Sequence, residues 1–345
     1  MKKNLLVTGL LICSFGVYSQ NSNSAGEYMG SIGEKHREIM ENVWDYTSSV
    51  AHGKSARKVE KRRKEVIQSV EDAQKFIRKM GDYNNDASLR DSVLSYLNIS
   101  HIVLTENYSK IVDMEAVAEQ SYDDMEAYLL AQKLANEKLD VAEEMMIQQQ
   151  KVFAASNNIN LIENNDQLAK NMKKASGVFN YYNKLYLVFF KSNKQEAYML
   201  DAMSKSDVNA IEQNRGVLSK FSGEGLSVLD TIKSYNGDIS LITATKQMLK
   251  FYKDEADVKL KTLANYFIEK EKFEKIKAAF DSKSQSSRTK ADVDNFNNAV
   301  NSVNKASNDY NTVNDVLNKN RSELINNWNN VAQGFLDKNV PKKKK

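Results

Sequence analysis

Proline and glycine are scarce in this chain, and both residues interrupt helices. The 345 residues include one proline, Pro341, and 13 glycines. Hydrophobic residues make up 41% of the chain, which is slightly low for a globular protein but far too high for a disordered one. We therefore predict an all-α fold, an elongated antiparallel bundle of about eight long helices.

Residues 1–19 have the three regions of a signal peptide. Lys2 and Lys3 supply the positive charge, residues 5–17 form an apolar segment, and Ser19 precedes the expected cleavage site. The apolar segment is too short to span a membrane. The chain is therefore predicted to be exported. Its expected location is the periplasm, the outer cell surface or the extracellular medium.

Cys13 is the only cysteine, and it lies within the predicted signal peptide. Lipid attachment to Cys13 is the alternative to cleavage after Ser19, although Ile12 is bulky where a lipoprotein signal needs a small residue. Cleavage would leave no cysteine, which excludes disulfides, thiolate zinc sites and cysteine nucleophiles. It would also lower the net charge from +4 to +2 by removing Lys2 and Lys3, so no global attraction to nucleic acid is expected.

Polar segments suggest how the mature chain is divided. The expected parts are a polar leader at 20–26, an N-terminal helical bundle at 27–156, a linker at 157–165, a C-terminal helical bundle at 166–335 and a basic tail at 336–345. Two four-helix sub-bundles would satisfy this division, although no convincing sequence repeat supports a duplication. The last helix carries an apolar heptad, which is typical of coiled coils.

Several residues are expected to cap helix N-termini, where short polar side chains can accept hydrogen bonds from the backbone. Ser55, Ser206 and Asp238 are the expected N-caps. Thr289 with Asp292 resembles a capping box.

The turn between the first two predicted helices is the strongest candidate site. The second helix opens with basic residues, and cations at a helix N-terminus oppose the helix dipole by about 0.3–1 kcal/mol each. An unfavourable arrangement of this kind indicates a function, and backbone N–H groups at a helix start can bind anions. The predicted anion-binding residues are His52, Gly53, Lys54, Ser55, Arg57, Lys58 and Lys61.

Two other interpretations compete at this turn. Residues 48–55 imitate a Walker A loop, but Ser48 replaces its first glycine and a helix precedes it instead of a strand. Nucleotide hydrolysis is therefore not expected. Asp45 is expected to lie near Arg62 or Arg63 across the turn, in which case part of the basic cluster forms internal ion pairs.

A second pattern imitates a calcium-binding loop. Asp82, Asn84 and Asp86 match positions 1, 3 and 5 of an EF-hand, but Ala87 and Val93 stand where glycine and glutamate are required. A helix-capping turn is therefore the better interpretation.

The remaining polar patterns do not indicate catalysis. His36, His52 and His101 are the only histidines, and none belongs to a metal-binding motif. The acid pairs at 123–124 and 143–144 diverge by about 100° on a helix, so neither pair shares a substrate. No catalytic, metal-ligating or cofactor-binding residue is predicted, and we do not expect an enzyme.

Residues 181–190 form an apolar run that contains Asn183 and Lys184. The run is too short to cross a bilayer, so burial inside the bundle is the main expectation. Exposure of the run to lipid would instead make the protein membrane-active, which is the alternative function.

Two segments carry a resemblance to a known family. Residues 28–63 and 110–139 are similar to a family of exported helical proteins designated "surface protein", found in Bacteroidetes and leptospiral spirochaetes. The resemblance covers nearly the whole mature chain. It implies export and surface display, and it implies no activity, cofactor or functional residue, since none is established for the family.

The sequence therefore favours an exported, non-enzymatic helical scaffold or binding module of the cell envelope. Its partner is expected to be a protein or an acidic envelope component, and no specific nucleic acid is expected. Neither a cofactor nor a transmembrane span is predicted for the mature chain. The oligomeric state is not determined by the sequence.

Overall fold

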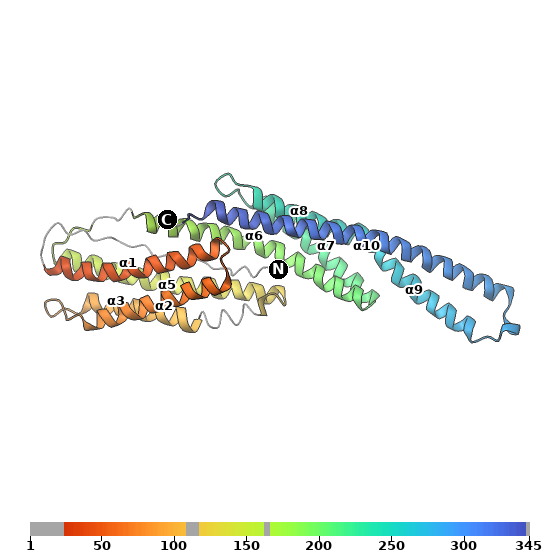
Figure 1. Ribbon diagram of the computed structural model, residues 1–345, viewed down its shortest axis with the longest axis horizontal. Coiled ribbons are helices and arrows are strands. Elements are labelled where there is room, and N and C mark those ends of the chain that lie inside the picture. The colour runs from red at the N-terminus through yellow and green to blue at the C-terminus, as the bar shows by residue number, and fades with distance from the viewer. Residues whose placement is uncertain (1–23, 108–116, 162–165, 343–345) are drawn as a thin grey trace. The chain divides into compact units, whose positions relative to one another are not determined.

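The computed structural model describes residues 24–107, 117–161 and 166–342 (Figure 1). Within these residues the chain forms eight helices and no strand, which confirms the predicted all-α fold. The predicted signal peptide and Cys13 lie outside the described residues. The elements are α1 (Ser24–Ala51), α2 (Ala56–Lys79), α3 (Ser88–Ile102) continued by the π-helix η1 (Val103–Asn107), α5 (Tyr122–Ser156), α6 (Gln167–Ser204), α7 (Val208–Thr231), α8 (Ser240–Asp254) continued by the π-helix η2 (Glu255–Lys259) and by α9 (Leu260–Asp281), the 3-10 helix η3 (Gln285–Ser287) and α10 (Lys290–Asn339).

The chain divides into two compact units. The first unit contains Met1–Lys184 and Ala332–Lys345, and the second contains Leu185–Val331. Both divisions fall inside helices, so α6 and α10 contribute residues to each unit. The predicted linker at 157–165 lies between α5 and α6 in the chain, and its residues 162–165 are outside the described part.

In the first unit, α2 packs against both α1 and α3, and α3 packs against α5 (Figure 1). Apolar residues at helical spacing form a stripe on α2, and this stripe faces the core. Burying a large aliphatic side chain contributes roughly 1.5–3 kcal/mol, so the stripe decides which face of α2 turns inward. Its buried members are Val59, Val66, Val70, Ala73 and Ile77, and Met80 is the C-cap of α2.

In the second unit, Trp328 of α10 joins three helices. Its ring stacks on Phe189 of α6 with the ring centroids 4.2 Å apart. Its Nε1 donates a hydrogen bond of 3.1 Å to Thr245 Oγ1 of α8. Trp328 is therefore buried with its only polar atom satisfied, the arrangement in which an indole contributes most to a core.

The same tight turn occurs once in each unit, between α2 and α3 and between α7 and α8. Tyr83 N donates to Asp86 O at 3.1 Å, and Asp86 N donates to Tyr83 O at 2.9 Å. Tyr235 and Asp238 form the same two hydrogen bonds at 3.1 and 2.9 Å. The two turns are thus identical in their backbone pairing.

The residues inside these turns also correspond. Asn84 and Asn236 both have φ of 50°, and they are followed by Asn85 with φ of 60° and Gly237 with φ of 83°. Positive φ favours glycine and asparagine, which explains why the turns contain these residue types.

The aspartate of each turn then supports the start of the next helix. Asp86 Oδ1 accepts a hydrogen bond of 2.8 Å from Ser88 N, and Asp238 Oδ1 accepts one of 2.9 Å from Ser240 N. Asp238 therefore stabilises the start of α8, although the N-cap position itself is taken by Ile239 and not by Asp238 as expected.

These turns belong to an internal repeat. The elements α7, α8 and η2 have the same lengths, and follow one another at the same spacing along the chain, as α2, α3 and η1. Segments 55–107 and 207–259 therefore align without a gap. Only eight residues are identical between them, too few for the sequence to indicate a duplication. The identical positions are Glu60/Glu212, Arg63/Arg215, Tyr83/Tyr235, Asn84/Asn236, Asp86/Asp238, Ser88/Ser240, Leu89/Leu241 and Leu97/Leu249.

Candidate functional site

The predicted basic turn lies between α1 and α2 and contacts the end of α10. Gly53 has φ of +59°, and a Cβ added there would lie 3.0 Å from Gln333 Oε1. Gln333 Nε2 in turn donates a hydrogen bond of 3.0 Å to Ala51 O. Glycine is therefore favoured at this position by both conformation and space.

His52 faces α10. Its Nδ1 lies 2.7 Å from Asp337 Oδ1, and its Nε2 lies 3.5 Å from Pro341 O. The side chain is only 10% exposed. His52 was predicted as an anion ligand, and the structure places it where it anchors the turn to a carboxylate.

Part of the basic cluster forms internal ion pairs, and the expected contact with Asp45 is confirmed. Arg62 Nη1 lies 3.4 Å from Asp45 Oδ2 and 2.6 Å from Glu65 Oε2. Lys61 Nζ lies 3.8 Å from Glu65 Oε1. These contacts neutralise the cations that lie more than one turn into α2.

The first turn of α2 keeps its positive charge. Lys54, Arg57 and Lys58 are exposed and have no acidic partner among the described residues. Ser55 is the N-cap as predicted, but its side chain makes no capping hydrogen bond, and the first turn contains no acid. An open pocket of about 630 Å³ is lined by Ser55, Arg57, Lys58, Glu60, Lys61, Arg62 and Lys64.

The equivalent turn of the second unit is capped by an acid. α6 ends through Ser206 with φ of 55°, the counterpart of Gly53. Asp207 is the N-cap of α7, and its side chain accepts a hydrogen bond of 3.0 Å from Ala210 N. The expected N-cap Ser206 is therefore wrong by one residue, because its left-handed backbone ends the preceding helix.

The two turns differ most in charge. Asn209 and Ala210 stand where the first unit has Arg57 and Lys58, and the second turn is one residue shorter, without a counterpart of Lys54. An acid at a helix N-terminus is favoured by the helix dipole and cations there are not. Since the second unit builds the same turn without these cations, the fold does not require them.

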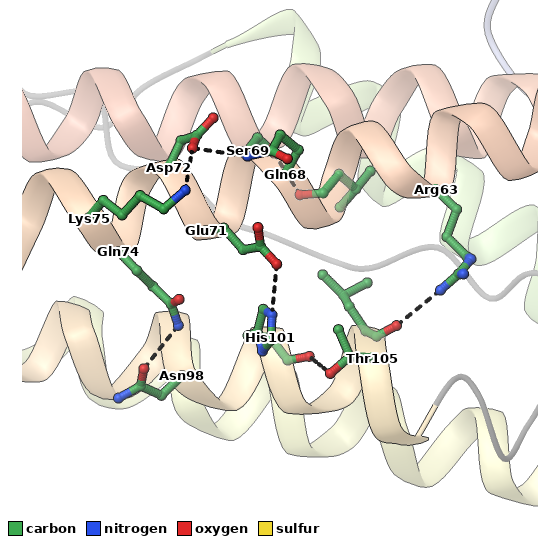
Figure 2. A network of polar contacts seen from close by, with 12 residues as sticks. Arg63, Gln68, Ser69, Glu71, Asp72, Gln74, Lys75, Asn98, His101 and Thr105 are labelled. Carbon is green, nitrogen blue, oxygen red and sulfur yellow. Dashed lines mark hydrogen bonds and ion pairs between the residues drawn. The ribbon is translucent and has the colours of Figure 1, made fainter.

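A different basic residue has a structural role that both units share. Figure 2 shows Arg63 reaching from α2 to η1, where its Nη1 donates a hydrogen bond of 3.2 Å to Leu104 O. Its Nε donates to Glu60 Oε2 at 2.9 Å. A π-helix shifts the usual backbone pairing, and the guanidinium supplies a donor to a carbonyl at that shift.

The second unit repeats this arrangement. Arg215 Nη1 donates to Ala256 O of η2 at 3.2 Å, and its Nε donates to Glu212 Oε2 at 3.0 Å. Both arginine side chains are 22% exposed. This arginine clamp (Arg63 in the first unit, Arg215 in the second) is thus part of the repeated scaffold.

The other histidines have structural surroundings. Burial lowers the pKa of His36 to about 4, so its imidazole is neutral at pH 7. His101 Nε2 lies 3.2 Å from Glu71 Oε1, in the polar contact between α3 and α2 (Figure 2). Across the described ranges, no group of three or more His, Cys, Asp or Glu side chains could hold a metal ion. In the EF-hand-like turn, Asp82 pairs with Arg90.

The apolar run at 181–190 is largely buried within α6. Tyr182, Leu185, Phe189 and Phe190 are each at most 3% exposed. In the part of the chain that the structure describes, no helix combines the length and apolar character needed to cross a membrane.

A cluster of buried charges in the second unit was not predicted. Arg321 of α10 donates through Nε to Glu196 of α6, and its Nη2 donates to Glu255 Oε1 of η2 at 2.5 Å. The side chains of Glu196 and Glu255 are 3% and 0% exposed, and that of Arg321 is 12% exposed. We call these three residues the acid–arginine cluster. The sequence feature that could have predicted the cluster is Glu255, an acid on an otherwise apolar helix face.

Comparison of the chain with protein-family models, with curated proteins and with solved structures finds no match. The resemblance of residues 28–63 and 110–139 to the exported "surface protein" family stays a prediction. Within the described residues, the chain forms two helical units, and α2 of the first unit begins with exposed, positively charged side chains.

Proposed function

We propose that this protein is an exported, non-enzymatic helical scaffold of the cell envelope, and that the basic turn of its first unit binds an acidic component of that envelope. The observation that carries the proposal is the contrast between equivalent turns. One unit caps its helix with Asp207, while the other exposes Lys54, Arg57 and Lys58 at the same place.

The chemistry of the turn suits an oxyanion such as a phosphate, sulfate or carboxylate. Arg57 supplies a planar guanidinium that can bind an oxyanion through two parallel hydrogen bonds, and Lys54 and Lys58 supply point charges. The uncapped start of α2 adds backbone N–H groups and the positive end of the helix dipole. Because the site is open to water, its attraction should weaken strongly with salt.

The same features support a binding role over a catalytic one. The turn presents cations, but it combines them with no nucleophile and general base in hydrogen-bonding geometry, which catalysis of group transfer needs. The signal-peptide pattern of residues 1–19 supports export, and the resemblance to exported "surface protein" chains supports an address at the cell envelope.

A charge-matched pair of variants tests the site. The variant Lys54→Gln/Arg57→Gln/Lys58→Gln removes three cations from the turn. The control Lys261→Gln/Lys290→Gln/Lys319→Gln removes three exposed cations from the second unit. Binding to vesicles containing phosphatidylglycerol and to inositol hexakisphosphate is measured at low and at physiological salt. At roughly 1 kcal/mol per cation near an acidic surface, the turn variant should bind at least about tenfold more weakly, and the control should be unchanged.

The binding measurements have outcomes that would contradict the proposal. Equal weakening in both variants would mean that net charge alone attracts the probes. Absence of binding by the wild type would leave the turn as a solvated face. Release of a dye from the same vesicles would instead support the membrane-active alternative, which requires residues 181–190 to leave the core.

A further inference from the structure

The acid–arginine cluster occupies positions that the first unit fills with apolar side chains. Val103 is the first residue of η1 and Glu255 is the first residue of η2, so the two positions are equivalent in the repeat. Counted back from the turns at Gly53 and Ser206, Val43 of α1 corresponds to Glu196 of α6. Both valines are 1% exposed. The repeated fold is therefore complete without the two carboxylates, and apolar replacements of buried ion pairs are often at least as stable.

The charges inside the cluster do not balance when both acids are ionised. Arg321 contributes one positive charge against the two carboxylates of Glu196 and Glu255, and the three side chains are nearly excluded from water. Within the described residues, Glu255 Oε2 has no hydrogen-bond partner. A proton on one carboxyl group would restore neutrality, as it does when two buried carboxylates share a site.

The charged side chains that α7, α8 and η2 itself carry beside the cluster are paired outside it. α7 presents Arg215, which is paired with Glu212 and contacts the Ala256 carbonyl rather than the cluster. On η2 itself Asp257 pairs with Lys253 of α8 at 2.7 Å. The groups that face Glu255 directly are Glu196 from α6, Arg321 from α10 and the Tyr252 hydroxyl from α8, which accepts a hydrogen bond of 2.8 Å from Asn193.

We propose that Glu196 and Glu255 together hold one proton in the folded second unit, and that loss of this proton to solvent weakens the packing of η2 against α6 and α10. With the proton bound, one carboxylate and one guanidinium form a neutral buried pair. Without it, two like charges share a dry site. Glu255 is the first residue of the π-helix η2, a rare conformation that is frequent at functional sites.

The direction of the pH effect follows from the environment of Glu255. Burial and the charge of Glu196 raise the pKa of Glu255 from 4.5 to about 8, although Arg321 opposes this shift. The folded state therefore keeps a proton that the unfolded chain releases near its ordinary pKa. Stability from this group is complete below pH 4.5 and is lost as the pH rises through about 8.

The two tryptophans allow the second unit to be observed separately. Trp44 is buried in the first unit and Trp328 in the second. In the Trp44→Phe background, the fluorescence of Trp328 reports the urea midpoint between pH 5 and pH 9. The midpoint should fall with rising pH, and Glu255→Gln, which imitates the protonated acid, should remove most of this fall. The control Glu224→Gln, at a side chain 50% exposed in the same unit, should leave it unchanged.

An infrared measurement tests the proton directly and does not depend on any variant folding. The wild type should show the C=O stretching band of a buried carboxylic acid at pH 7, and the band should disappear with a midpoint near pH 8. Absence of this band at pH 7 overturns the proposal. An identical pH dependence of the midpoint with and without Glu255→Gln overturns it as well.

Discussion

Segments 55–107 and 207–259 share one scaffold and differ in where they carry charge. At the start of its first helix, the first unit has exposed cations and the second has the capping acid Asp207. At the start of the π-helix the second unit carries the unusual charge, because it has the buried acid Glu255 where the first unit has Val103. Each unit therefore has one charged site at which the other unit has the energetically more favourable residues.

The shared residues and the differing residues have different roles. Most of the shared ones shape the backbone, as the arginine clamp and the two identical turns show. The differing ones leave the fold unchanged. A residue that one unit lacks without losing the structure is a better candidate for function than a residue that both units need.

The largest expected effect concerns the acid–arginine cluster. Arg321→Met leaves buried carboxylates without a cation and should lower the free energy of unfolding by about 3–5 kcal/mol. The variant Glu196→Val/Glu255→Val/Arg321→Met imitates the first unit and should be at least as stable as the wild type. Urea denaturation followed by Trp328 fluorescence in the Trp44→Phe background measures both, and a loss in the triple variant as large as that of Arg321→Met would contradict the comparison.

Steric fit should give the next largest effect. Gly225 stands where the first unit has the buried Ala73, and a Cβ at Gly225 would lie 2.8 Å from Leu249 Cδ1. Gly225→Leu should therefore destabilise the second unit by about 3 kcal/mol through overpacking. Gly216 has no atom within 4 Å of its added Cβ, so Gly216→Ala should instead stabilise by up to about 1 kcal/mol. Thermal unfolding measures both variants, and melting temperatures that shift in the same direction would be inconsistent with this geometry.

The arginine clamp should matter equally in the two units. Arg63→Met and Arg215→Met each leave a carbonyl of a π-helix without its donor, at an expected cost of about 1–2 kcal/mol. Trp44 fluorescence in the Trp328→Phe background reports the first variant, and Trp328 fluorescence in the Trp44→Phe background reports the second. A difference of more than about 1 kcal/mol would show that the repeat is not energetically equivalent at this point.

The smallest effect is expected at the tight turns. Asn85 and Gly237 both have positive φ, which glycine adopts without a steric penalty. Asn85→Gly should therefore stabilise the first unit by about 0.5 kcal/mol, and Gly237→Asn should destabilise the second unit by a similar amount. Chemical denaturation of the two single variants measures both changes in stability. Changes of the same sign would contradict the equivalence of the two turns.

Local features were predictable from the sequence alone. The scarcity of proline and glycine determined the helical fold, and the apolar spacing on α2 determined its buried face. The capping box at Thr289 is present, with Thr289 Oγ1 accepting a hydrogen bond of 3.2 Å from Asp292 N. The contact between Asp45 and Arg62 followed from a short antiparallel turn. These features depend on residues close together in the chain, so spacing suffices to predict them.

Only the tertiary structure revealed the repeat and the acid–arginine cluster. Buried positions accept many apolar residues of similar size, so two segments can share a fold with few identical residues. Glu196, Glu255 and Arg321 lie on three different helices, and their meeting depends on how those helices pack. Tertiary structure likewise placed His52 beside Asp337, whereas Lys54, Arg57 and Lys58 are exposed. The sequence determined which residues carry charge, and packing decided which of those charges are buried, paired or free to bind.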